Sequence, residues 1–175
     1  MAQIIKCFLG GKYMTLSLFC DILLSNLPFA KAEIKGNAEN RSIRGEVNFY
    51  QVGKNVVVAA DISGLPQRSG DCDCGVFGFH IHEGESCTGT SAEPFADTKG
   101  HYNPKNCPHP CHAGDMPPLF ENSGRAWMAF MTDRFEVDEI IGKTVIIHSK
   151  PDDFTTQPSG NSGQKIACGV IERFT

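Results

Sequence analysis

The feature that most limits what this chain can fold into is a series of short runs of β-branched and aromatic residues separated by Gly, Pro, Asn and Asp. Such runs are typical of strands joined by turns, and no helical periodicity links them. Strands without alternating helices exclude α/β folds, and 175 residues are too few for a βα-barrel of about 250. The sequence therefore predicts an all-β domain with strands over residues 43–52, 55–62, 76–82, 125–132, 144–149 and 166–171.

The N-terminal 32 residues differ from the rest, and we interpret residues 1–32 as a tail and residues 33–175 as the domain. A mostly apolar stretch over residues 13–24, followed by Ala30-Lys31-Ala32, imitates a signal peptide with its cleavage site. Asp21 inside the apolar stretch opposes that interpretation because a charge there is costly.

The alternative for this tail is a short helix over residues 15–24 that docks on the domain through Leu18, Ile22 and Leu23. The compartment stays open with it: we favour the cytoplasm, and an extracytoplasmic location follows if residues 1–32 are a cleaved signal peptide.

The charge and hydropathy of the chain exclude two classes of partner. A formal net charge of −4 at pH 7 lacks the basic surface that nucleic-acid binding requires. No apolar run reaches the roughly 20 residues of a transmembrane helix. We therefore expect no nucleic-acid partner and no transmembrane segment.

A long loop separates the third and fourth predicted strands, over residues 83–124, and it holds six of the ten prolines. A loop of this length inside a compact domain needs something to organise it. Within it, His101, His109, His112 and Asp115 follow the spacing His-x7-His-x2-His-x2-Asp. Three imidazoles and one carboxylate complete a tetrahedral zinc site of the closed, structural kind. We therefore expect zinc to organise this loop.

Two further histidines lie on a predicted strand directly before the loop. The alternation of a strand places His80 and His82 on one face, and Phe77, Phe79 and Ile81 on the opposite face. The apolar face can join the core while both imidazoles point to a common site outside it. His-x-His alone is equally compatible with two surface histidines on an edge strand.

Five segments together make the chain resemble the copper/zinc superoxide dismutase family: GFHIHEGESC (residues 78–87), GHYNP (100–104), HAGDMPPL (112–119), GKTVIIHSKPDD (142–153) and GNSGQKIACGVI (160–171). The resemblance extends over residues 36–171 and leaves the tail outside. It implies an eight-stranded Greek-key β-barrel or sandwich, with a metal-binding loop and a second, electrostatic loop outside the barrel.

The same resemblance implies two metal ions with a shared ligand. Copper would be bound by His80, His82, His101 and His148, and zinc by His101, His109, His112 and Asp115, so all six histidines are used. Four nitrogen donors suit Cu(II). Asp152 matches a carboxylate that holds one ligand of each metal, here His80 and His109.

Cys87 and Cys168 match the intrasubunit disulfide of the family. The pairing of the other six cysteines stays open: Cys107 and Cys111 can pair or coordinate, and Cys7, Cys20, Cys72 and Cys74 have no counterparts. Lys165 stands where the family has an arginine that guides the anionic substrate, and Lys150 can add a second positive charge. An ammonium is a point charge without the planar fork of a guanidinium, so this departure puts the catalytic rate in doubt.

The activity that the resemblance implies is the dismutation of superoxide to oxygen and hydrogen peroxide, in which His101 exchanges the catalytic proton. A homodimer is left open. One alternative is a copper-binding or copper-delivery module of the same fold with little turnover, which Lys165 makes conceivable. A zinc hydrolase that uses His-x-His is a further alternative, although the chain lacks the length and βα pattern of the usual barrel.

Overall fold

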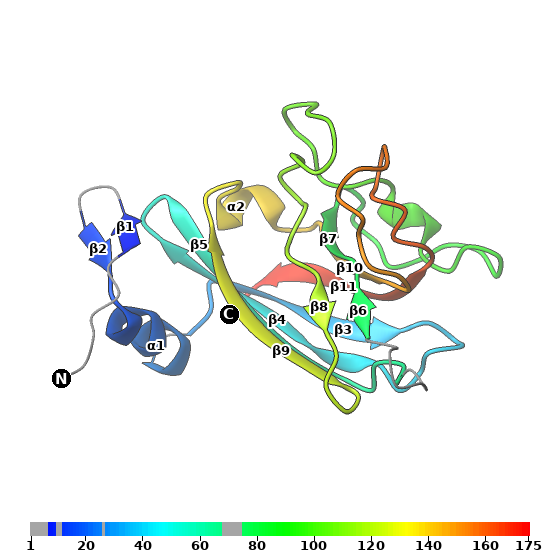
Figure 1. The fold of residues 1–175 in the computed structure, drawn as a ribbon, viewed down its shortest axis with the longest axis horizontal. Helices are drawn as coiled ribbons and strands as arrows, with labels where there is room; N and C mark the ends of the chain where they lie inside the picture. The colour runs from blue at the N-terminus through cyan, green and yellow to red at the C-terminus, as the bar shows by residue number, and fades with distance from the viewer. Residues whose placement is uncertain (1–6, 10–11, 26, 68–74) are drawn as a thin grey trace.

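A computed structural model describes residues 7–9, 12–25, 27–67 and 75–175 of the chain. Its central element is a seven-stranded antiparallel sheet in the order β7-β10-β11-β3-β4-β5-β9, which curls around one core (Figure 1). The strands are β3 (Ala30–Gly36), β4 (Arg44–Val52), β5 (Asn55–Ser63), β7 (Phe79–His82), β9 (Arg125–Thr132), β10 (Thr144–His148) and β11 (Lys165–Arg173).

The two edges of the curled sheet are linked by a short antiparallel pair, β6 (Val76–Phe77) with β8 (Leu119–Phe120). Gly78 alone separates β6 from β7, and β8 precedes β9 along the chain. When β6 and β7 are counted as one strand, the barrel of the described residues has the eight strands that we expect from the sequence. The all-β prediction is therefore confirmed, and all six predicted strands form.

Three short helices and a hairpin complete the described structure. The hairpin pairs β1 (Cys7–Leu9) with β2 (Lys12–Met14), and α1 (Leu16–Ser25) follows it. A 3-10 helix, η1 (Ala96–Thr98), lies in the long loop, and α2 (Val137–Ile140) lies between β9 and β10. No helix among the described residues is long and apolar enough to cross a membrane.

The strand β3 is the longest element that our sequence prediction lacks. It starts at Ala30, three residues before the expected domain boundary, and pairs with β11 on one side and β4 on the other. Ala30 and Ala32, the small residues of the signal-like motif, are fully buried in it. A cut after Ala32 would therefore remove the first three residues of an inner strand.

The helix α1 forms where the helix alternative for the tail requires one. Ile22 is buried against Tyr50 and Val57 on the outer face of β4 and β5, and Leu23 packs beside it. Leu18, which we expected to dock, is 41% exposed. Phe19 packs in its place, because it precedes Ile22 and Leu23 by three and four residues and so lies on their helix face.

The core fills the inside of the barrel and determines where the histidines point. Phe77, Phe79 and Ile81 are buried in the main apolar cluster, as the alternation of the strand predicts. His80 and His82 consequently project from the outer face of β7. They are buried nonetheless, because the long loop and the loop between β10 and β11 fold over that face (Figure 1).

Candidate metal centre

Two overlapping groups of potential metal ligands lie on the outer face of β7 and β10. The strand group consists of His80, His82, His101 and His148, and the loop group consists of His101, His109, His112 and Asp115. In each group every residue offers one ligand atom, these atoms lie within 4.8 Å of one another, and all the side chains are buried. His101 belongs to both groups, so the two sites are adjacent.

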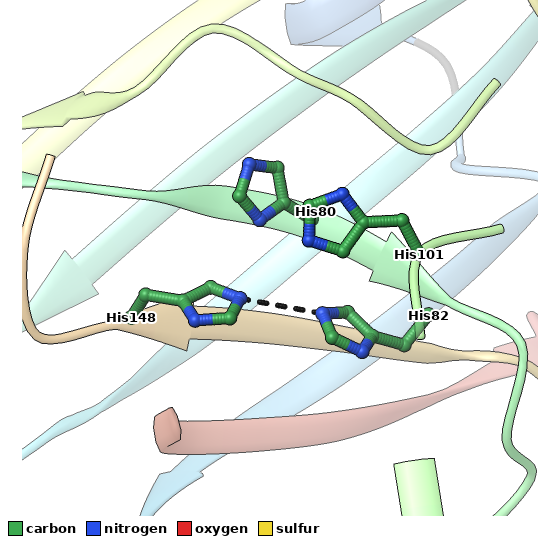
Figure 2. A group of neighbouring side chains, drawn as sticks. All are labelled: His80, His82, His101 and His148. Atoms are coloured by element: carbon green, nitrogen blue, oxygen red, sulfur yellow. Dashed lines mark hydrogen bonds between the residues drawn. The ribbon is translucent and has the colours of Figure 1, made fainter. Parts of the chain in front are cut away.

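Regular strand geometry positions the strand group. His80 and His82 project from β7, and His148 ends the neighbouring strand β10 (Figure 2). His101 arrives from the long loop through an isolated bridge to His82. The Nε2 atoms of His82 and His148 approach to 3.3 Å (Figure 2).

The outer ring nitrogens of the strand group hydrogen bond to protein oxygen atoms. His82 Nδ1 donates to the carbonyl of Lys99 at 2.9 Å, and His148 Nδ1 donates to the carbonyl of Gly163 at 3.3 Å. In the neutral rings, both Nε2 atoms therefore carry lone pairs that face each other. Such an approach is unfavourable unless a cation lies between the lone pairs, so this group is shaped for a metal ion.

The loop group surrounds one carboxylate with imidazoles. Asp115 Oδ1 lies 2.7 Å from His101 Nδ1 and 3.4 Å from His112 Nδ1, and its Oδ2 lies 3.1 Å from His109 Nδ1. All three histidines therefore present Nδ1 to the centre of the group. His109 and His112 lie on an irregular segment that no regular strand supports.

Three buried imidazole nitrogens have no hydrogen-bond partner among the described residues: His80 Nδ1, His101 Nε2 and His109 Nδ1. A buried polar atom without a partner is costly, and each of these atoms belongs to a ligand group. Four imidazole nitrogens suit Cu(II), and three imidazoles with one carboxylate suit Zn²⁺. The residues present therefore fit one copper and one zinc ion.

Asp152 connects the two groups. Its Oδ2 accepts a hydrogen bond from His80 Nε2 at 2.7 Å, and its Oδ1 accepts one from His109 Nε2 at 2.9 Å. Burial raises the pKa of Asp152, but hydrogen bonds from His80, the Phe154 amide and His109 outweigh it and hold the pKa well below its usual range. The carboxylate is therefore ionised, and it fixes Nδ1 of both rings as the lone-pair atom.

Burial also keeps two rings of the strand group neutral. It lowers the pKa of His82 well below its usual value, with the neighbouring His148 and His101 acting in the same direction. Burial, together with the nearby His80, lowers the pKa of His148 to about 3. Only a neutral imidazole offers a lone pair to a metal ion, so both rings are ready to coordinate at neutral pH.

Lys165, the first residue of β11, makes three contacts with the long loop. Its Nζ donates to Thr98 Oγ1 at 2.8 Å, to the carbonyl of Lys99 at 2.8 Å and to that of Phe95 at 3.3 Å. Burial lowers the pKa of Lys165, and Glu93 partly opposes this. The Lys99 carbonyl also accepts from His82. The Lys165 ammonium and a ring of the strand group therefore share one acceptor.

The disulfide that the family resemblance implies is present between Cys87 and Cys168, with a Cα–Cα distance of 5.7 Å. It packs with Phe95 and Ile146 over the outer face of the sheet. Cys20, Cys107 and Cys111 are free thiols, and none of them belongs to a ligand group. The side chain of Cys7 and the whole of Cys72 and Cys74 lie outside the described residues.

Three residues that our sequence analysis did not single out contact the loop segment that carries the loop group: Asn103, Arg134 and Gln157. Pro108 and Pro110 give one signal in the sequence, because two prolines in so short a segment leave it unable to form a strand ladder. That signal indicates a need for other partners but does not identify them.

A barrel that carries two adjacent, histidine-rich metal sites with one shared imidazole defines a dinuclear metalloprotein. Comparison with known proteins identifies its class: the sequence profile described as copper/zinc superoxide dismutase matches residues 43–171. The chain belongs to this family.

Three bacterial proteins illustrate the similarity. Superoxide dismutase [Cu-Zn] 2 of Aquifex aeolicus is 30% identical over 170 residues, which are 86% of this chain and 94% of the relative. Superoxide dismutase [Cu-Zn] of Legionella pneumophila is 33% identical over 138 residues, covering 73% of this chain and 77% of the relative. The Escherichia coli K12 enzyme of the same name is 32% identical over 142 residues, with coverages of 73% and 78%.

Proposed function

We propose that this protein dismutates superoxide: one anion gives up an electron and leaves as dioxygen, and a second takes up an electron and two protons and leaves as hydrogen peroxide. The observation that carries this function is the pair of buried ligand groups joined at His101. When bound, copper supplies the alternating electron acceptor and donor, and zinc supplies a fixed charge beside it.

We assign the metal ligands from the lone pairs that face each group. Copper would be held by His80 Nδ1 and by Nε2 of His82, His101 and His148. Zinc would be held by Nδ1 of His101, His109 and His112 and by the Asp115 carboxylate. The three unpartnered ring nitrogens and the two facing Nε2 atoms support this assignment. Asp152 is the positioning residue for His80 and His109, which it orients through their outer nitrogens.

His101 is the residue that holds the catalytic proton. Its Nε2 is buried without a partner, while its Nδ1 lies beside Asp115. Nε2 can therefore take a proton and release it to the reduced anion while the loop group keeps the ring in place. This exchange is general acid–base catalysis at a stated atom.

Lys165 guides the anion by its charge. An ammonium has three N–H donors, and the three loop acceptors can occupy all of them. Lys165 therefore attracts superoxide through its field and leaves no donor for a direct hydrogen bond, whereas a guanidinium has five donors. Lys150, an exposed residue in the loop that follows β10, adds a second positive charge to this field.

The test of the function is a stopped-flow measurement of superoxide decay with protein loaded with one copper and one zinc ion per chain. Decay that is first order in protein and far faster than that caused by the same protein loaded with zinc alone is expected. A fully loaded protein without turnover would instead support the copper-delivery alternative. Light scattering in the same buffer measures the oligomeric state, for which a homodimer stays a prediction.

A further inference from the structure

The segment that carries the loop group has no regular secondary structure to hold its main chain. Residues 107–115 include Pro108 and Pro110, which have no N–H group and so cannot join a ladder. Main-chain groups that are removed from water must nevertheless find partners. Gly114 bonds to the main chain of Ile81 and Tyr102, whereas both main-chain groups of Cys107 and of His109 bond to side chains.

Gln157 is the one of these side chains that binds both the amide and the carbonyl of a ligand residue. Its Oε1 accepts from the amide of His109 at 3.0 Å, and its Nε2 donates to the carbonyl of His109 at 2.7 Å. One carboxamide thus takes both main-chain groups of His109, in the way that a neighbouring strand would. Gln157 lies in the loop between β10 and β11, 48 residues away in the chain.

The same loop also holds the side chain of His109. Asp152 accepts from His109 Nε2, so two residues of this loop bind His109 at its ring, its amide and its carbonyl. These three contacts fix both the position of the Cα atom and the direction of the ring. His109 Nδ1, the remaining polar atom of the residue, faces the Asp115 carboxylate and makes no hydrogen bond.

Two other side chains hold the rest of the segment without touching His109. Arg134 Nη1 lies 3.1 to 3.2 Å from the carbonyls of Pro110, His112 and Asp115. Asn103 binds the amide and the carbonyl of Cys107 at 2.9 and 2.8 Å. Asn103 therefore repeats the role of Gln157 two residues away, on a residue that is not a ligand.

We infer that Gln157 is a positioning residue for zinc: it holds His109 in the coordinating geometry before the metal binds, and so increases zinc affinity. The inference rests on the proposed function, since it takes His109 as a zinc ligand. Partners of metal ligands outside the ligand set are typically worth 10–100-fold in affinity. We expect an effect at the lower end of that range, because Gln157 acts through the main chain of His109.

The experiment compares three isosteric variants in otherwise intact protein: Gln157→Met, Asn103→Leu as the matched control, and Gln164→Met as a control in the same loop. Gln157 lies at the surface, so its replacement leaves no cavity. Zinc affinity is measured by competition with a chelator. Gln157→Met is expected to weaken it about tenfold, and both controls by less than about twofold.

Two further measurements report on geometry and not on activity. In metal-free protein, the His109 amide is expected to exchange slowly with deuterium in the wild type and quickly in Gln157→Met. In protein with Co²⁺ in the loop group, the visible absorption bands are expected to change in Gln157→Met and to keep their wild-type shape in Asn103→Leu.

The outcomes separate this inference from the proposed function. If His109→Ala abolishes zinc binding while Gln157→Met binds zinc as the wild type does, the ligand assignment stands and the inference is wrong. If His109→Ala keeps full zinc affinity, the ligand assignment itself is wrong. Equal losses in Gln157→Met and Asn103→Leu would also overturn the inference, because they would indicate a general loosening of the loop.

Discussion

The two ligand groups are held in place by different means. In the strand group, His80, His82 and His148 lie on β7 and β10, whose ladder pairs Phe79 with Ile147 and places the residues around them. In the loop group, His101 and Asp115 form isolated bridges to β7, whereas His109 and His112 are held by the side chains of Gln157 and Arg134. The difference teaches that ligands on strands inherit their positions from the core, whereas ligands on a loop depend on a few separate polar contacts.

Replacing His101 should have the largest effect, because it should disrupt both ligand groups at once. Because it belongs to both groups, His101→Ala should weaken copper and zinc binding by more than about 100-fold each, beyond the usual effect of partners outside the ligand set. Superoxide turnover should be lost with them. His148→Ala should spare zinc, and His112→Ala should spare copper. Metal analysis after dialysis decides, and full retention of both ions by His101→Ala would end the assignment of a shared ligand.

The disulfide tests how far the long loop depends on its covalent attachment. Cys87 and Cys168 are 81 residues apart in the chain, and closing a loop of that length contributes about 4 kcal/mol to the free energy of unfolding. Cys87→Ser with Cys168→Ser should lower the stability of the metal-free protein by about that amount, measured by urea unfolding. Cys107→Ser with Cys111→Ser is the control and should change it by less than about 1 kcal/mol.

Asp152 offers a way to loosen both groups at once without removing a ligand. In Asp152→Asn, one of the two imidazole N–H donors loses its acceptor and faces an amide N–H donor instead. We expect copper and zinc affinities each to fall by about 10-fold to 100-fold, measured by chelator competition. Asp153→Asn, at the adjacent exposed carboxylate, is the control. A loss confined to one metal would contradict the bridging role.

The pH dependence of the metal-free protein reports on two histidines of the strand group. His82 and His148 have lowered pKa values in the fold, His148 to about 3, whereas unfolded histidines titrate near 6.5. Below pH 6.5 these two histidines bind protons in the unfolded state but not in the folded state. The free energy of unfolding therefore falls as the pH drops from about 6.5 towards 3.

Urea unfolding at several pH values, in the presence of a chelator, measures this slope. Each of these rings contributes up to about 1.4 kcal/mol per pH unit. His148→Leu should make the slope shallower by one such contribution. A stability that stays constant over this pH range would show that the rings are not held neutral.

The smallest expected effect belongs to Lys165, whose charge lies next to the strand group. Lys165→Ala should lower the second-order rate of superoxide decay about threefold, the effect of one unit charge several ångströms away in wet surroundings. It should also flatten the salt dependence. Lys165→Glu should lower the rate further, and Lys165→Arg should hold or raise it. Equal rates for the wild type, Lys165→Ala and Lys165→Glu at two ionic strengths would remove Lys165 from the mechanism.

The regular part of the fold could be predicted from the sequence because it follows a simple period. The six predicted strands agree with the structure to within two residues at each end, and the core face of β7 follows from its alternation. The strand β3 was missed for a physical reason: its residues AKAEIKG have low strand propensity, and the small residues of Ala30-Lys31-Ala32 also fit a cleavage motif. The signal available in the sequence was the alternation of Ala30, Ala32 and Ile34 with charged residues.

The ligand groups could be predicted from spacing and from the family resemblance, but the contacts that hold the loop could not. Gln157 and Arg134 are exposed polar residues in turns, and nothing in their local sequence distinguishes them from solvated ones. Their roles arise only when distant segments meet. That zinc organises the long loop stays a prediction, and side chains hold part of the main chain around the loop group.

The close packing around Gly160 determines which phenotype a substitution at this position should have. A Cβ atom at this residue would lie 1.9 Å from Asp152 Oδ1 and 2.8 Å from His109 Nε2, and its φ of +67° already favours glycine. Any side chain at this position would displace the Asp152 carboxylate, which binds one histidine of each ligand group. In a saturation screen, alleles at codon 160 should therefore fall into one phenotypic class with those at codon 152, deficient in both metals, and separate from the single-metal alleles at codons 112 and 148.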